Sequence, residues 1–327
     1  MSDYQARVAE FSALLREVRN QIGQVIVGQQ TVVTELLKTI FANGHALIEG
    51  VPGLGKTLLV STLGQVFRLG SRRIQFTPDL MPADILGTNL IVEDAAGRKR
   101  FEFQKGPVFT QIVLADEINR ATPKTQSALL QAMQERSVTV AGVTYELDKP
   151  FFVLATQNPI EMEGTYPLPE AQVDRFLTKI LIQYPNQQEL MAILDRTTGA
   201  APLEVKTVMD SAKILAAQKL AAEVPVPDHV RDAVTRLVLA THPESDLASD
   251  MVKKYVRYGA SPRGGQAMLM TAKVTSLMDN RYSVSLDDVK SVLHICMRHR
   301  LLLSFEGEAE GVKTDDILAD LEKRLLK

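Results

Sequence analysis

The sequence is poor in several features that mark particular classes of protein. Its 327 residues include one cysteine, Cys296, which excludes an internal disulfide and a cysteine zinc cluster and suits a reducing cytoplasm. The net charge is only -2, so no overall basic field indicates nucleic acid as a partner. No apolar run is long enough to cross a bilayer, and residues 1–10 are polar, without the apolar core of a signal peptide. We expect a cytoplasmic protein with no membrane span.

The histidines do not predict a metal site. There are five, they are scattered, and His294 and His299 are five positions apart and therefore not on one helical face. The hydrophobic fraction of 45% and the charged fraction of 23% are those of an ordinary globular protein. The length is compatible with two domains.

One glycine-rich stretch has the spacing of a phosphate-binding loop: a glycine, four free positions, then Gly-Lys-Thr. An apolar segment at 45–49 predicts a buried strand before it, and apolar residues at helical spacing follow it. In such a loop glycines let backbone N–H groups approach phosphates, and the helix N-terminus adds partial positive charge. Lys56 can reach the β- and γ-phosphates, and the Thr57 hydroxyl can ligate Mg²⁺. The predicted nucleotide contacts are Gly50, Val51, Pro52, Gly53, Leu54, Gly55, Lys56, Thr57 and Leu58.

A second apolar run, residues 111–115, ends in two acids, which is the Walker-B pattern. Asp116 at the end of this strand can hold the Mg²⁺ shell, and Glu117 is placed to polarise a water for attack on the γ-phosphate. A third buried strand, residues 151–155, is followed by Thr156, Gln157 and Asn158. A polar side chain there could orient the attacking water; the alternative is a simple turn residue.

The remaining pattern predicts an α/β half followed by an all-α half. Helices are expected at 4–22 and 32–41, with a break at 23–28 whose apolar residues 25–27 either line an adenine pocket or pack in the core. Further strands are expected at 73–77 and 179–182, and hairpins at 89–103 and 138–147. Beyond residue 185 only helices are expected, at 187–197, 208–222, 228–241, 262–280 and 286–298, with Asp228, Ser261 and Ser285 as N-caps and a surface helix within 306–327.

Taken together, these motifs resemble the AAA+ ATPases, and within them the MoxR family. The matching segments are 50–57, 116–121, 155–159, 169–176 and 261–263. The resemblance implies an αβα core with a five-stranded parallel sheet at 1–184 and a helical lid at 185–327. It also implies two family insertions, a helix-two insert at about 81–107 and a pre-sensor hairpin at about 137–150, where the two hairpins are expected.

The resemblance also assigns roles to single residues. It implies that Asn158 is the first sensor, that Arg175 is an arginine finger for a neighbouring subunit, and that Arg263 is the second sensor, acting in cis or in trans. Arg120 is a further intersubunit candidate, with an exposed structural role as its alternative. The implied activity is Mg²⁺-dependent ATP hydrolysis in a ring, as in the hexamers of the family. Hydrolysis would remodel a client protein together with a von Willebrand factor A domain partner.

Three other functions are weighed against this one. A nucleic-acid motor is suggested by the basic cluster at 98–100, although the net charge and the second hairpin, which has no basic tip, argue against it. A non-hydrolysing scaffold would be suggested by an altered Walker-B glutamate, but Glu117 is present. The ATPase subunit of a metal-ion chelatase is the third.

Overall fold

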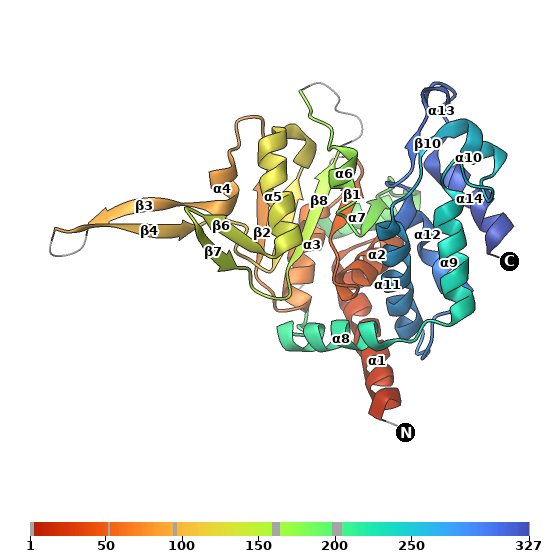
Figure 1. Ribbon diagram of the computed structural model, residues 1–327. Helices are drawn as coiled ribbons and strands as arrows, with labels where there is room; N and C mark the ends of the chain where they lie inside the picture. The colour runs from red at the N-terminus through yellow and green to blue at the C-terminus, as the bar shows by residue number, and fades with distance from the viewer. Residues whose placement is uncertain (1–2, 52, 94–96, 159–163, 198–204, 327) are drawn as a thin grey trace.

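The computed structural model describes residues 3–51, 53–93, 97–158, 164–197 and 205–326. Its centre is a parallel sheet in the order β2-β5-β8-β1-β9 (Figure 1). The strands are β1 (Ala46–Glu49), β2 (Ser71–Gln75), β5 (Ile112–Asp116), β8 (Phe152–Gln157) and β9 (Thr178–Leu181). This confirms the predicted five-stranded parallel sheet and its place in the first half of the chain.

Both faces of the sheet are covered, which is why its strands read as continuous apolar runs. Successive side chains of β5 alternate between the two faces. Ile112 and Leu114 pack in the same apolar cluster as α1 (Asp3–Val25), α2 (Gln30–Phe41) and α3 (Lys56–Val66). Val113 and Ala115 pack in a second cluster with α4 (Pro82–Leu86) and α5 (Pro123–Glu135).

Two antiparallel hairpins leave the core beside one another. The longer, β3 (Gly87–Glu93) with β4 (Lys99–Lys105), extends away from the body in Figure 1, and β6 (Ser137–Val140) with β7 (Val143–Glu146) lies near its base. The Phe103 and Tyr145 rings stack at 4.3 Å between centroids and join the two. Both hairpins were predicted, although residues 94–96 of the expected turn lie outside the described residues. Their assignment to the two family insertions stays a prediction.

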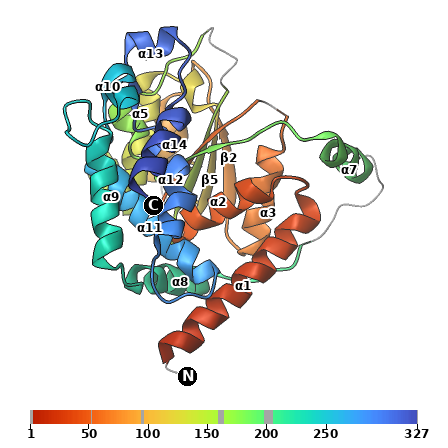
Figure 2. The same ribbon diagram turned by 90° about the vertical axis from the view of Figure 1, so that its right-hand side faces the viewer.

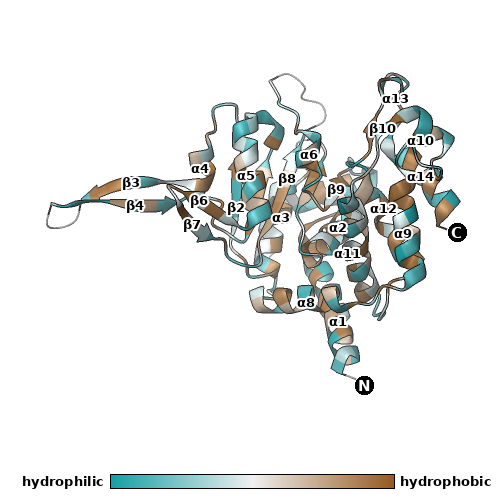
Figure 3. Cartoon of the chain, viewed as in Figure 1, coloured by the Kyte–Doolittle hydropathy of each residue, from teal (hydrophilic) through white to brown (hydrophobic). Residues whose placement is uncertain are grey.

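The second half of the chain is a block of helices around α11 (Pro262–Met278), which contacts α1 and α2 of the core as well as its neighbours. These neighbours are α8 (Ser211–Glu223), α9 (Asp228–Ala240) and α12 (Leu286–Met297), and α14 (Thr314–Leu325) packs on α9 and α12. The first helix after the sheet, α7 (Gln187–Thr197), stands apart from them (Figure 2). Apolar residues gather where these helices face one another (Figure 3). No helix in the described part of the chain is long and apolar enough to span a membrane.

Some boundaries differ from the sequence prediction. Helix α1 continues through Gly23 to Val25, where the Val25 side chain packs on the apolar cluster. The N-cap of α9 is Pro227, and Asp228 is the first helical residue. The predicted surface helix within 306–327 is α14, which buries one face through Ile317, Leu318 and Leu321 and exposes charged residues on the other. The predicted N-caps Ser261 and Ser285 are confirmed, and Ser285 forms a capping box with Asp288.

The sequence prediction also missed short elements. They are α10 (Asp250–Tyr255), α13 (Phe305–Ala309) and the ribbon of β10 (Val256–Tyr258) with β11 (Leu302–Leu303). Each is too short to show a period, so only tertiary packing defines it. The division of the two halves at residue 184 stays a prediction.

His45, which precedes β1, makes stability depend on pH. It is buried; its Nδ1 accepts a hydrogen bond from the N–H of Val153 at 3.0 Å, so its Nε2–H donates to the Met133 carbonyl at 3.1 Å. Burial lowers the pKa of His45 to about 4. The unfolded chain therefore binds this proton first as the pH falls. The free energy of unfolding should drop by on the order of 3 kcal/mol between about pH 6.5 and pH 4 through this group.

Urea denaturation across that pH range measures the effect. The His45→Gln variant should lose this part of the acid destabilisation, whereas the matched change at the exposed His229 should keep it. An identical pH slope for both variants would contradict the assignment.

Candidate functional site

The glycine-rich loop lies at the carboxyl end of β1 and leads into α3. Gly53 and Gly55 have φ angles of +83° and +74°, a left-handed region that favours glycine. A Cβ at Gly50 would lie 3.0 Å from the Ile182 carbonyl oxygen, so the loop also needs glycine for close approach. The Lys56 ammonium donates to the Gly50 carbonyl at 2.6 Å across this loop. Pro52 lies outside the described residues.

Lys56 faces a cavity of about 230 Å³ that is lined by half of the predicted site residues. The cavity is lined by Gly53, Gly55, Lys56, Thr57, Arg73, Asp116, Glu117 and Asn158. Partial burial lowers the pKa of Lys56, and the carboxylates of Asp116, Glu117 and Glu49 act in the opposite direction. Thr57 and Leu58 are exposed in the first turn of α3. A helix N-terminus, a lysine and a hydroxyl thus face one space, an arrangement suited to phosphate groups.

The two Walker-B acids are held differently. Asp116 accepts from the Thr156 hydroxyl at 2.6 Å through Oδ1, and from Arg73 Nη2 at 2.7 Å through Oδ2. Glu117 is a non-glycine residue with φ +56°, and its N–H donates to the same Thr156 hydroxyl at 2.8 Å. Its Oε2 accepts from Gln75 Nε2 at 3.1 Å and from Arg120 Nη1 at 3.2 Å. The Glu117 carboxylate is therefore held by two donors from its own chain.

Sequence reasoning missed Arg73 and Gln75. Both lie on β2, which pairs in parallel with β5, and Gln75 stands opposite Asp116 in the register. The period of two along a strand places these side chains on one face. They lie beside the Walker-B acids because β2 is next to β5 in the sheet, and this strand order cannot be predicted from a local sequence pattern.

Thr156 and Gln157 at the end of β8, and Asn158 directly after it, have different roles. Thr156 is fully buried and bonds to both Walker-B residues, whereas Asn158, 6% exposed, lines the cavity. Gln157 pairs with Glu49 within the sheet. Of the three polar residues considered from the sequence, the structure brings Asn158 to the cavity and makes Thr156 the support of Asp116 and Glu117.

A second cavity, of about 490 Å³, borders the segment between α1 and α2. Gly28 and Gln29 line it from one side and Leu181 and Tyr184 from the other, and Gln29 Nε2 donates to the Leu54 carbonyl at 3.0 Å. Ile26, by contrast, is buried in the apolar core. Of the two alternatives considered for residues 25–27, core packing is therefore the one found for Ile26, whereas Gly28 and Gln29 line the cavity.

A divalent ion fits the first cavity on the chemistry of its donors. Asp116 and Thr57 supply a carboxylate and a hydroxyl, and Mg²⁺ commonly takes one or two carboxylates and completes its shell with water and phosphate oxygens. The described residues contain no group of three or more His, Cys, Asp and Glu side chains placed to hold a metal. An ion here would thus depend on a bound phosphate for part of its shell.

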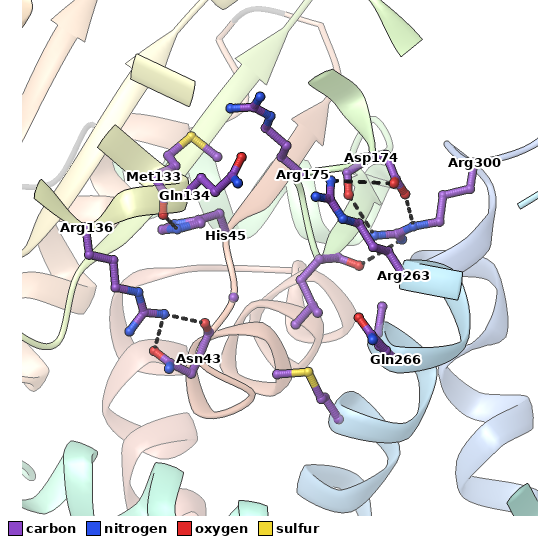
Figure 4. Close-up of a pocket in the computed structure, with 14 residues that line it drawn as sticks. Asn43, His45, Met133, Gln134, Arg136, Asp174, Arg175, Arg263, Gln266 and Arg300 are labelled. Carbon is purple, nitrogen blue, oxygen red and sulfur yellow. Dashed lines mark hydrogen bonds and ion pairs between the residues drawn. The ribbon is translucent and has the colours of Figure 1, made fainter. Parts of the chain in front are cut away.

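The two arginines predicted to act on nucleotide lie elsewhere. Arg175 follows α6 (Glu170–Val173), is half-buried, and donates Nη1 to the Leu130 carbonyl at 3.1 Å. Arg263 stands in the first turn of α11, half-exposed, with Nη1 3.7 Å from Asp174 Oδ2. Both line another cavity, of about 280 Å³, between the core and the lid helices (Figure 4).

This cavity and the glycine-rich loop are at opposite ends of the strands. Thr178, the first residue of β9, pairs in parallel with Ala46, the first residue of β1. Arg175 comes shortly before Thr178 in the chain and therefore lies at the amino end of these strands. Lys56 follows the carboxyl end of β1, and a strand of that length spans roughly 13 Å. Within one subunit the structure brings Arg175 and Arg263 together and keeps both away from Lys56.

Comparisons with known proteins agree with this geometry. Residues 45–178 match the ATPase family associated with various cellular activities (AAA), and residues 248–321 match an AAA lid domain. The chain is 42% identical to chaperone MoxR1 of Mycobacterium tuberculosis over 91% of this chain and 78% of that protein. It is 39% identical to YeaC of Bacillus subtilis over 94% and 93%, and 30% identical to MoxR of Paracoccus denitrificans over 91% of each chain.

A solved structure is also similar. The crystal structure of a candidate ATPase from Cytophaga hutchinsonii superposes with a TM-score of 0.91 at 39% identity, covering 97% of this chain and 96% of that one. The sheet order, the site and these relatives lead to one conclusion: the chain belongs to the MoxR family of AAA+ ATPases.

Proposed function

We propose that the protein hydrolyses ATP with Mg²⁺ in a ring of identical subunits, each nucleotide being bound by one subunit and completed by arginines of the next. The observation that carries this proposal is the separation of Arg175 and Arg263 from their own Lys56 by the length of the sheet. Arginines that take part in phosphoryl transfer must therefore serve the phosphate of a neighbour. Arg263 then acts in trans.

Within one subunit the proposed roles follow the cavity. Gly50 to Leu58 bind the phosphates, with Lys56 on the β- and γ-phosphates and with Thr57 and Asp116 holding Mg²⁺. Bound Mg²⁺ would neutralise charge that develops on the phosphate oxygens. Glu117 polarises the attacking water, and Asn158 orients it. Gln75 and Arg120 both bond to Oε2 of Glu117, and because a carboxylate has about four acceptor sites the proposed water can bond to it as well.

The arginine finger makes assembly a condition of turnover. Phosphoryl transfer depends mainly on positioning and charge stabilisation, and a finger contributes roughly 10³ to 10⁵ in rate. Such a contact between subunits is heterologous, because the surface that contributes the arginine differs from the surface that binds the nucleotide. Heterologous contacts form closed rings when the rotation between subunits permits it. A hexamer is the form we propose.

For the biological role we propose chaperone-like remodelling of a client protein, with a von Willebrand factor A domain protein as partner. A chaperone name among the relatives supports it, as do apolar side chains on the projecting hairpin: Ile91 and Phe101 face each other across the strands and are 63% and 75% exposed. A chain with one cysteine forms no internal disulfide, which is compatible with the reducing cytoplasm that we propose as its location.

A nucleic-acid motor is the second candidate, and a metal-chelatase subunit is a third. The basic residues 98–100 lie on the same hairpin, but Arg100 pairs with Glu102 and the net charge is -2. DNA binding that weakens steeply with salt would favour the motor.

Glu117→Gln tests the catalytic base. The amide keeps the size of the side chain and loses its basicity, so phosphate release should fall about 10²- to 10⁴-fold while ATP binding persists. Steady-state phosphate release and calorimetric nucleotide binding measure the two effects. Unchanged turnover would remove Glu117 from this role.

Thr156→Val tests the support of the Walker-B residues. The valine has the same shape but leaves the Glu117 N–H and the Asp116 carboxylate without the hydroxyl. We expect turnover to fall roughly 10- to 100-fold and the free energy of unfolding to fall by about 1–3 kcal/mol. Thr156→Ser, which restores the hydroxyl, should recover most of both. If valine and serine behave alike, the hydroxyl has no such task.

Mixing two inactive variants tests the composite site. Glu117→Gln subunits cannot hydrolyse but still offer Arg175, whereas Arg175→Ala subunits keep Glu117 but offer no finger. Each alone should be inactive, and co-assembly should restore turnover, measured by phosphate release. Mixed assemblies that stay as inactive as their parents would refute action in trans.

A further inference from the structure

We propose that Arg300, acting through Asp174, is a positioning residue that presents Arg175 to the neighbouring subunit, so that the lid helices set the place of the finger. The inference rests on the proposed role of Arg175 in trans. Arg300 follows α12 in the lid, and its side chain is only 2% exposed. A buried guanidinium is costly unless it is paired and fully bonded, which makes its partners informative.

The bonds of Arg300 lie on both sides of Arg175 in the chain. Its Nε donates to Asp174 Oδ1 at 2.8 Å, directly before the finger. Its Nη2 donates to the Phe176 carbonyl at 2.7 Å and its Nη1 to the Leu177 carbonyl at 3.2 Å, directly after it. The planar fork of an arginine can reach such a set of acceptors at once, and lysine cannot. The backbone that carries Arg175 is thus fixed by one lid side chain.

Asp174 joins two lid segments at this point. Besides Arg300 it accepts from the Ser261 hydroxyl at 2.9 Å, directly before α11. It also pairs at 3.7 Å with Arg263 in the first turn of that helix (Figure 4). The residues before Arg300 continue the connection. His299 Nε2 bonds with the Phe176 carbonyl at 3.1 Å, and Arg298 Nη1 donates to the Lys179 carbonyl at 3.3 Å.

These contacts make the finger segment and the lid one mechanical unit. Arg175 itself is held towards the core by the Leu130 carbonyl, and its guanidinium lines the open cavity beside Arg263. A lid displacement driven by the nucleotide of one subunit would therefore move the finger that this subunit offers to the next. Asp174 and Arg300 would carry the signal from site to site without touching nucleotide.

The test places the change in one partner of a mixed assembly. Asp174→Asn or Arg300→Lys is introduced either into the Glu117→Gln subunit, which donates the finger, or into the Arg175→Ala subunit, which has none to position. In the donor either change should lower the restored kcat about 10- to 100-fold with little change in the KM for ATP. In the acceptor it should leave the restored turnover in place, because the working finger belongs to the other subunit.

A matched control uses another buried pair of the lid. Arg281 bonds to Asp288, which is 2% exposed, at the start of α12 and away from the finger. Asp288→Asn in the donor should lower the melting temperature as much as Asp174→Asn does, and should retain the restored turnover.

Equal losses from donor and acceptor placements, or no loss from the donor placement, would overturn the positioning role while leaving the composite site intact. Failure of the two parent variants to restore turnover at all would reject the composite site, and this inference with it.

Discussion

The direction of the strands is the constraint on which the rest of the structure depends. In a parallel sheet every strand delivers its carboxyl end to one edge and its amino end to the other. The glycine-rich loop follows β1 at the first edge, and Arg175 precedes β9 at the second, so no single subunit can bring both to one phosphate. The proposed coupling of hydrolysis to assembly follows from that direction.

The Walker-B residues show how the same sheet supports the chemistry at the first edge. β5 lies between β2 and β8 in the sheet. Asp116 and Glu117 therefore bond to side chains of both neighbouring strands: Arg73 and Gln75 from β2, and Thr156 from β8. Thr156 is buried and bonds to both residues, so a single hydroxyl holds the proposed metal-binding group and the proposed water-activating group. At the second edge Arg300 has a comparable supporting role. Its buried guanidinium bonds to Asp174 and Phe176, the residues on either side of Arg175, which is the proposed arginine finger.

The sequence was sufficient where a pattern is local. The glycine spacing, the apolar runs that end in Asp116 and Thr156, and the Ser261 and Ser285 caps all depend on residues close in the chain, and the corresponding strands and helices are confirmed. It was insufficient where partners are distant. The bonds of Arg73 to Asp116 and of Arg300 to Asp174 join residues 43 and 126 positions apart, and neither arginine has a local signature. The short elements α10 and β10 were missed because packing alone defines them.

The central claim, that one subunit completes the site of another, is tested most directly by solving the structure of the Glu117→Gln assembly with ATP and Mg²⁺. We expect the Arg175 guanidinium within about 3.2 Å of a γ-phosphate oxygen whose triphosphate is bound by Lys56 of the adjacent subunit. A structure in which Arg175 still bonds only to the Leu130 carbonyl of its own subunit, with the γ-phosphate enclosed by one chain alone, would contradict it.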